Sequence, residues 1–139
     1  MIVCIDTNSL MSMLSLSHPN RQILHEWVSG RFHWAVSNEV MTEYEEMLLP
    51  RIGEARWKSF LNVLDMISDT QRNLIRTDPS FRFEVITSDL DDNKFCDCAI
   101  VANADYVITE DKHFQALTGS GYKPQPIKPD AFLTLLQKS

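Results

Sequence analysis

The sequence predicts an α/β fold built on a mostly parallel sheet. Short apolar runs of strand length alternate with stretches of helical periodicity along the whole chain, and this order is typical of helices packed on a parallel sheet. The chain has 139 residues and an apolar content of 44%, which is enough for a core of two or three layers. We therefore expect a single domain that covers residues 1–139.

Each expected strand is a short apolar run that ends in polar residues. The first run is Ile2–Ile5, which stops at Asp6. The long segment Arg76–Asn93 and the Gly- and Pro-rich segment Thr118–Pro126 are expected to be loops. The other expected strands are His33–Val36, Phe83–Ile86 within the first of these loops, Tyr106–Ile108, and a short one at Gln125–Lys128.

The expected helices are recognised by apolar periodicity and by start and stop signals. Leu10–Leu16 is expected to form a separate turn, because Pro19 breaks the pattern soon after it. Gly30 is a suitable stop for the next helix, and Ser37 or Asn38 can cap the one that follows. The expected helices are Asn20–Ser29, Asn38–Leu49, Ala55–Ile67, Asn93–Ala102, a short turn after Asp111, and Asp130–Gln137.

The charge balance restricts the class of partner. Thirteen basic and 19 acidic residues give a formal net charge of −6, which argues against binding nucleic acid through a broad basic surface. Either the partner is not a polyanion, or bound cations neutralise some of the acids. No apolar run approaches the roughly 20 residues that span a bilayer, and no leader precedes the first strand, so we expect a soluble protein that is not exported.

The three cysteines indicate a reducing compartment. Cys4, Cys96 and Cys98 are odd in number and lie in apolar surroundings, which suits reduced core thiols and a cytoplasmic location. Cys96 and Cys98 form a C-x-C, and no second pair of ligands stands at zinc spacing from them. Structural zinc is therefore only the minor alternative.

Two acidic positions directly follow strands of the expected sheet. Asp6 ends the first strand, and Thr109, Glu110 and Asp111 follow the strand at Tyr106–Ile108. Because the carboxyl ends of parallel strands lie at the same edge, Asp6 and Asp111 should meet there, where ligands bind in open α/β sheets. Taken alone, either acid would be interpreted as a helix cap or a solvated turn residue.

A third acid stands in an almost wholly apolar helix. Asp97 is the only polar residue of the stretch FCDCAIVA, and a buried carboxylate is costly unless it is paired or bound to a cation. The competing interpretation is a salt bridge from Asp97 to Lys94 or Lys128.

In the helix after Ser37 the glutamates at 43 and 45 both flank the apolar stripe, and spacing alone does not choose between Glu43 and Glu45.

Carboxylates that converge in this way favour a divalent metal site. They would repel one another without a cation, and Mg²⁺ and Mn²⁺ take oxygen ligands and share their remaining positions with phosphate oxygens. The chain has no G-x-x-x-x-G-K-[ST], G-x-G-x-x-G or G-x-S-x-G motif and no histidine pair at i, i+4. His113 is interpreted as a surface residue of the short helix near Asp111.

Three blocks of sequence, in this order, resemble the PIN domain family, in particular its VapC-like toxin branch. They are IDTN near the start, SNEVMTEY, and DDNKFCDCAIVANADYVITEDKHF. The resemblance covers nearly the whole chain. It implies a three-layer α/β/α sandwich with a central, mostly parallel sheet of about five strands, and a ribonuclease that depends on Mg²⁺ or Mn²⁺.

The resemblance also implies roles for individual residues. The catalytic acids of the family correspond to Asp6, Glu43, Asp97 and Asp111, of which Asp6, Asp97 and Asp111 resemble metal ligands. Residues that support this quartet are expected at Thr7, Asn8, Asp92 and Thr109. The cations expected to face RNA are Arg51, Arg56, Lys58, Lys94 and Lys112, and a solvated surface charge is an equally good interpretation of each. Glu110 departs from the family, where a small or basic residue is common, and should weaken RNA binding.

These observations lead to three hypotheses about function. The first is a metal-dependent endoribonuclease, the toxin of a toxin–antitoxin pair, which acts on RNA, is inhibited by a small antitoxin protein and belongs to a family in which homodimers are common. The second is a non-catalytic PIN-like module for RNA binding or assembly. The third, a receiver domain phosphorylated on aspartate, is disfavoured because no lysine follows a late strand end in the expected way.

Overall fold

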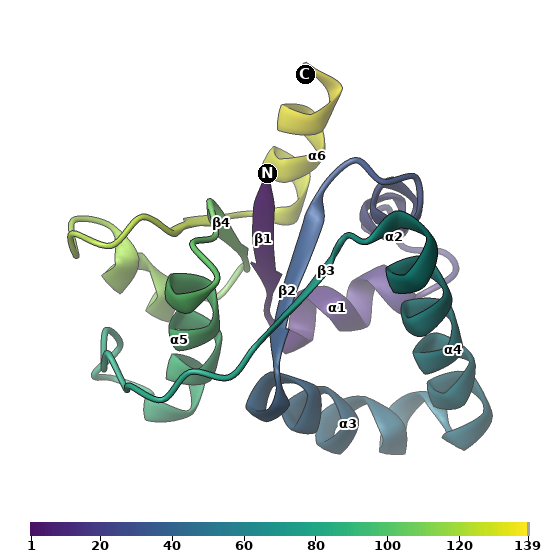
Figure 1. Cartoon of the computed structure of the whole chain (residues 1–139), viewed down its shortest axis with the longest axis horizontal. Coiled ribbons are helices and arrows are strands. Elements are labelled where there is room, and N and C mark those ends of the chain that lie inside the picture. The colour runs from purple at the N-terminus through teal and green to yellow at the C-terminus, as the bar shows by residue number, and fades with distance from the viewer. Residues whose placement is uncertain (139) are drawn as a thin grey trace.

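The computed structural model describes residues 1–138 and contains one sheet of five parallel strands. The strand order is β3-β2-β1-β4-β5, so the first strand lies at the centre (Figure 1). The strands are β1 (Ile2–Ile5), β2 (His33–Ser37), β3 (Leu74–Thr77), β4 (Tyr106–Ile108) and β5 (Gln125–Ile127). The predicted α/β fold with about five mostly parallel strands is confirmed.

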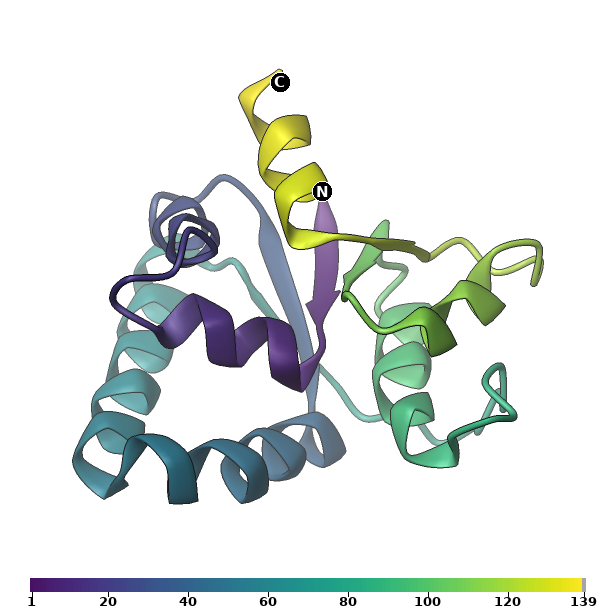
Figure 2. The same ribbon diagram turned by 180° about the vertical axis from the view of Figure 1, so that it is seen from behind.

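Helices cover both faces of the sheet, which makes the predicted three-layer α/β/α sandwich (Figure 2). In Figure 1 the strands run downward, so α3 crosses the region of their carboxyl ends, whereas α6 stands at the opposite end. The helices are α1 (Thr7–Leu14), α2 (Arg21–Val28), α3 (Asn38–Ile52), α4 (Glu54–Gln71), α5 (Asn93–Val101) and α6 (Pro129–Gln137), with 3-10 turns η1 (Leu90–Asp92) and η2 (Lys112–Leu117).

One expected strand is wrong. Phe83–Ile86 is irregular, and the strand that pairs with β2 is instead Leu74–Thr77. The segment is apolar because Ile86 is fully buried in the core, and not because the segment joins the sheet. The side-chain amide of Asn93 donates to the carbonyl of Ile86 and accepts from its N–H, each at 2.8 Å. These two bonds replace a strand partner.

The helices around the carboxyl end of the sheet are longer than expected. The separate turn at Leu10–Leu16 is wrong, because a full helix α1 begins directly after Asp6. Helix α3 continues through Pro50 to Ile52, and Gly53, with a φ of 89°, lets α4 begin at once. This φ lies in the region that only glycine adopts at low cost. The chain therefore turns from α3 into α4 through Gly53 alone, and α4 rises steeply from the end of α3 (Figure 1).

Aromatic residues fill the core beneath β1 and β2. The rings of Trp27 and Trp34 pack edge to face with centroids 5.3 Å apart, and Trp34 also packs on Tyr44 of α3. The hydroxyl of Tyr44 donates to the carbonyl of Ile5, which fixes α3 against the end of β1. The cysteines are buried and form no disulfide, as predicted. No helix within residues 1–138 has the length and apolar character required to cross a membrane.

Candidate functional site

Asp6 and Asp111 follow adjacent parallel strands, and Thr109 connects them. Ile5 of β1 stands in register with Ile108 of β4, so the residues after both strands emerge side by side. The hydroxyl of Thr109 donates to Oδ2 of Asp6, and the backbone N–H of Asp111 donates to Oγ1 of Thr109 at 2.9 Å. The structure thus brings both predicted strand-end acids to one place.

Asp6 is a buried carboxylate with few compensating charges. It is 6% exposed, and its Oδ1 accepts the N–H of Ser9 at 2.8 Å, which caps α1. Burial raises the pKa of Asp6, the hydrogen bonds from Thr109 and Ser9 oppose this, and the charge of Asp111 raises it further. A cation near Asp6 would therefore stabilise its ionised form.

Helix α3 brings Glu43 toward the same group. The hydroxyl of Thr7, directly after Asp6, donates to Oε2 of Glu43 at 3.1 Å. The ammonium group of Lys94 on α5 lies 3.1 Å from the other carboxylate oxygen, Oε1, and the side chains of this pair are 20% and 23% exposed. Glu45, in contrast, is exposed. Of the two glutamates that the sequence left open, Glu43 is the one that faces Thr7.

Asp92, expected to support the quartet, lies at the start of α5 beside Asp111. Its Oδ2 is 3.5 Å from Nδ1 of His113, and the same Nδ1 is 3.5 Å from Oδ1 of Asp111. Ligand atoms of Asp89, Asp92 and His113 all lie within 4.8 Å of one another. Burial and the charges of Asp89 and Asp111 raise the pKa of Asp92 to about 6, against the opposing effect of His113.

Asp97 lies on α5 and contacts the loop at Phe83. Its Oδ1 accepts the backbone N–H of Phe83 at 3.1 Å, and it lines a small hollow together with Glu39, Arg82 and Lys94, the ion partner of Glu43. Burial raises its pKa, while the bond from Phe83 and the charge of Arg82 lower it. Within residues 1–138, no hydrogen bond joins Asp97 to Asp6, Glu43, Asp92 or Asp111, and no salt bridge joins it to Lys94 or Lys128.

The remaining expected site residues are placed as follows. Asn8 is exposed on the first turn of α1, and Glu110 is exposed between Thr109 and Asp111. Lys112 is exposed directly after Asp111, so it lies close to the acids. Of the five cations expected to face RNA, Lys94 thus pairs with Glu43, and Lys112 lines a hollow together with Asp111.

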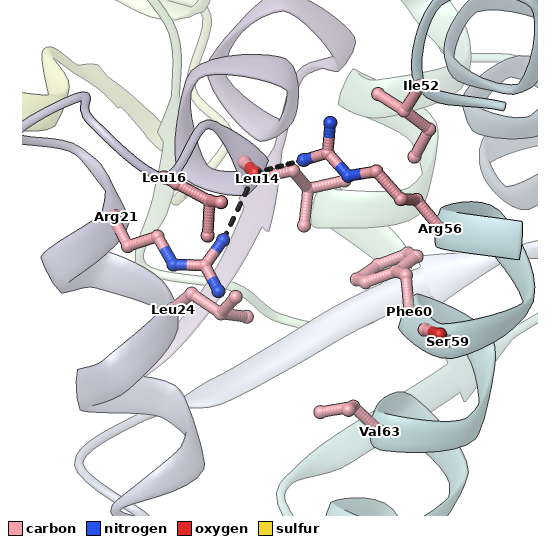
Figure 3. Close-up of a pocket in the computed structure, with 9 residues that line it drawn as sticks. All are labelled: Leu14, Leu16, Arg21, Leu24, Ile52, Arg56, Ser59, Phe60 and Val63. Atoms are coloured by element: carbon pink, nitrogen blue, oxygen red, sulfur yellow. Dashed lines mark hydrogen bonds between the residues drawn. The ribbon is translucent and has the colours of Figure 1, made fainter.

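The other three cations are engaged elsewhere. Arg51 donates to the sulfur of Met11 at 3.3 Å, and Lys58 forms an exposed ion pair with Glu54. Arg56 donates to the carbonyl of Leu14 at 2.9 Å at the rim of a largely apolar pocket of about 180 Å³ (Figure 3). Figure 3 shows Arg21 pointing at the same carbonyl, 3.1 Å away. This pocket lies between α1, α2, α3 and α4, and none of the acids described above lines it.

Two residues near Asp92, His113 and Asp89, have contacts that the sequence does not indicate. His113 was interpreted as a surface residue, yet its ring is half-buried and its Nδ1 faces two carboxylates. Asp89 was not singled out, and it caps η1 by accepting the N–H of Asp91 at 3.1 Å. No sequence pattern indicates these contacts, because η1 and η2 come together only when α5 packs beside β4.

The fold and the acidic group define an α/β/α domain with carboxylates gathered at the carboxyl end of its central strands. The sequence pattern of the PIN domain family matches residues 2–113, which is most of the chain. The chain therefore belongs to the PIN domain family. PIN domains are usually nucleases that use divalent metals, so membership together with the acidic cluster indicates nuclease activity. No curated protein is similar enough to the chain to count as a match.

Proposed function

We propose that this PIN domain is an endoribonuclease that depends on Mg²⁺ or Mn²⁺ and works in the cytoplasm as one domain over residues 1–139. The observation that carries the proposal is the link through Thr109 between Asp6 and Asp111, at the carboxyl ends of adjacent parallel strands. Glu43 and Asp92 extend this acidic group from α3 and from the start of α5.

The residues present fit a divalent cation. Oδ2 of Asp92 is shielded from solvent and has no hydrogen-bond partner among residues 1–138. The neighbouring charges of Asp89 and Asp111 disfavour its ionised form, as Asp111 also does for Asp6. A hard cation with carboxylate ligands would satisfy the unpartnered oxygen and remove the repulsion. When bound, such an ion lowers the pKa of an attacking water and stabilises charge on the phosphorus centre.

We assign the acids as follows. Asp6 and Asp111 hold the cation, and Thr109 and Thr7 fix the orientations of Asp6 and Glu43 through the hydrogen bonds described above. Glu43 orients the water, and Lys94 beside it neutralises negative charge that RNA brings to the site.

The third acid of the quartet is the point that needs revision. The family resemblance carried this role to Asp97, whereas the contacts to His113 and the charge of Asp111 support Asp92 in its place. Asp97 instead accepts a backbone N–H from the loop at Phe83, which supports a structural role. We therefore propose Asp92 as the third acid.

The biological role proposed for the nuclease is that of a VapC-like toxin. The support for it is the resemblance of the sequence blocks to that branch of the family. In this role a small antitoxin protein inhibits cleavage, and a basic side chain placed among Asp6, Asp92 and Asp111 would be electrostatically favoured there. Homodimers are part of the same proposal.

One observation favours a second candidate, a non-catalytic PIN-like module for RNA binding or assembly. Glu110 is exposed beside Asp111, and three of the five expected RNA-facing cations are engaged away from the acids. An acidic rim of this kind disfavours phosphate binding unless cations compensate it. This module would bind RNA or a basic partner without cutting.

Cleavage of a mixed-sequence single-stranded RNA tests the proposal. The full chain is assayed with Mn²⁺, with Mg²⁺ and with EDTA, alongside the parallel preparations Asp111→Asn, Asp92→Asn and Asp97→Asn. We expect metal-dependent cleavage by the parent, its loss in Asp111→Asn and Asp92→Asn, and its retention in Asp97→Asn. The pair Glu43→Gln and Glu45→Gln is a matched control, and only the first should lose activity. Equal cleavage by the parent and Asp111→Asn would overturn the proposal.

A further inference from the structure

We infer that His113 supplies a nitrogen ligand to the metal site, and that the site consequently favours a first-row transition metal over Mg²⁺. This inference rests on the proposed function in one respect, because it requires a divalent cation beside Asp92 and Asp111. It goes beyond the family resemblance, which implies carboxylate ligands alone.

Nδ1 of His113 lies close to two carboxylates at distances that one metal ion could bridge. Nδ1 of His113 lies 3.5 Å from Oδ2 of Asp92 and 3.5 Å from Oδ1 of Asp111. Two atoms bound at about 2.1 Å to one octahedral ion are roughly 3 Å apart, so the observed separations need to close by only about half an ångström. A carboxylate oxygen of Asp89 completes a set within 4.8 Å of Asp92 and His113.

Two of these atoms are buried without a good hydrogen bond within residues 1–138. Nδ1 of His113 and Oδ2 of Asp92 are both shielded from solvent, and their contact with each other at 3.5 Å is too poor in geometry to count as a hydrogen bond for either. Buried polar atoms are nearly always satisfied, since an unsatisfied one costs about 1–3 kcal/mol. Because the nitrogen and the oxygen face each other, one partner that accepts a lone pair from each of them would satisfy both. A metal ion is such a partner.

The backbone holds the imidazole in this position. The N–H of His113 donates to Oδ1 of Asp111 at 2.9 Å, which caps η2. Phe114, the next residue, is buried in the core and anchors the turn. The ring therefore stays beside Asp111 without depending on an ion pair to Asp92.

The chemistry of the nitrogen decides which metal is favoured. Mg²⁺ binds oxygen ligands and retains its waters, whereas imidazole is a good ligand for first-row transition metals. Carboxylates alone would accept Mg²⁺ and Mn²⁺ alike. The addition of His113 to Asp92 and Asp111 shifts the preference toward Mn²⁺ and the ions that follow it in the transition series.

The competing explanation is a direct ion pair between His113 and Asp92 with no metal at the nitrogen. Electron spin echo envelope modulation of the full chain loaded with Mn²⁺ separates the two. Directly bound imidazole gives ¹⁴N coupling to Mn²⁺, which we expect in the parent and not in His113→Gln. The matched control is His25→Gln, because His25 is exposed on α2, and this variant should keep the coupling.

Competition between Mn²⁺ and Mg²⁺ gives a second readout that does not depend on activity. We expect the ratio of Mn²⁺ to Mg²⁺ affinity to fall about tenfold in His113→Gln and to be unchanged in His25→Gln. Labelling the histidines of the parent with ¹⁵N replaces the ¹⁴N signal by a ¹⁵N signal, which detects the bond even where His113→Gln folds poorly.

The outcomes of these experiments distinguish the inference from the proposed nuclease. Bound Mn²⁺ without nitrogen coupling, or an unchanged affinity ratio in His113→Gln, overturns the role of His113 and leaves the nuclease intact. Failure of the parent to bind Mn²⁺ also overturns it. Nitrogen coupling in a parent that cuts no RNA supports the inference and counts against the nuclease.

Discussion

Thr109 joins the carboxylate of Asp6 to the backbone of Asp111. Its hydroxyl donates to Oδ2 of Asp6, and its oxygen accepts the N–H of Asp111 at 2.9 Å. One short side chain therefore sets both the orientation of the buried acid after β1 and the turn that positions the acid after β4.

Removal of this hydroxyl should destabilise the fold. Thr109→Val keeps the shape of the side chain, but it leaves Oδ2 of the buried Asp6 without its donor and should lower the free energy of unfolding by about 1–3 kcal/mol. Urea denaturation at neutral pH with EDTA measures the change. Thr109→Ser retains the hydroxyl and should lose less. If the valine variant is as stable as the parent, the bond to Asp6 contributes nothing.

Metal binding should stabilise the protein through Asp92 and not through Asp97. A ligand at a hundredfold excess over its Kd adds about 2.7 kcal/mol of stability, so saturating Mn²⁺ should raise the melting temperature of the parent by several degrees. Differential scanning fluorimetry with and without Mn²⁺ should show this rise in Asp97→Asn and its loss in Asp92→Asn. The reverse pattern would return the third acid to Asp97.

Stability without metal should depend on pH through Asp92. Its pKa of about 6 in the folded protein exceeds the ordinary value of 3.8, so the folded state holds the proton more tightly than the unfolded state. Stability from this group is therefore complete below about pH 4 and is lost as the pH rises toward about 6. Thermal melts in EDTA across this window should show a steeper decline for the parent than for Asp92→Asn, which cannot titrate there. Identical slopes would contradict the shift.

Lys94 should contribute to RNA binding, and Lys58 should not. The ammonium group of Lys94 lies beside Glu43 in the site, whereas Lys58 pairs with Glu54 on the exposed surface of α4. Removal of one phosphate contact weakens binding to all RNA sequences. It also reduces the slope of log affinity against log salt concentration by about one. Fluorescence anisotropy at several salt concentrations, in an Asp111→Asn background, compares Lys94→Gln with Lys58→Gln. Equal losses would remove Lys94 from the site.

The sequence alone predicted four of the five strands. Three of them, β1, β2 and β4, are the central strands of the sheet, and central parallel strands are nearly continuous apolar runs. The strand that was not predicted, β3, is only partly buried and contains the exposed Arg76, so Leu74–Thr77 is not a continuous apolar run. The run at Phe83–Ile86 has strand-like composition, yet it serves to place Ile86 in the core. Apolar composition predicts that a segment is buried. It does not predict whether the segment pairs with a strand, because that depends on whether a neighbouring strand has free backbone N–H and C=O groups.

The sequence by itself also determined that Asp6 and Asp111 meet, because two acids that end parallel strands of one sheet emerge at the same edge. It favoured Asp97 as the third acid and gave Asp92, five residues earlier, only a supporting role. Asp92 ends η1 and Asp97 lies within α5, so the orientation of one side chain does not follow from that of the other. The packing of α5 against β4 turned Asp92 toward Asp111 and His113, and Asp97 toward the loop at Phe83, and only the tertiary structure fixes that rotation.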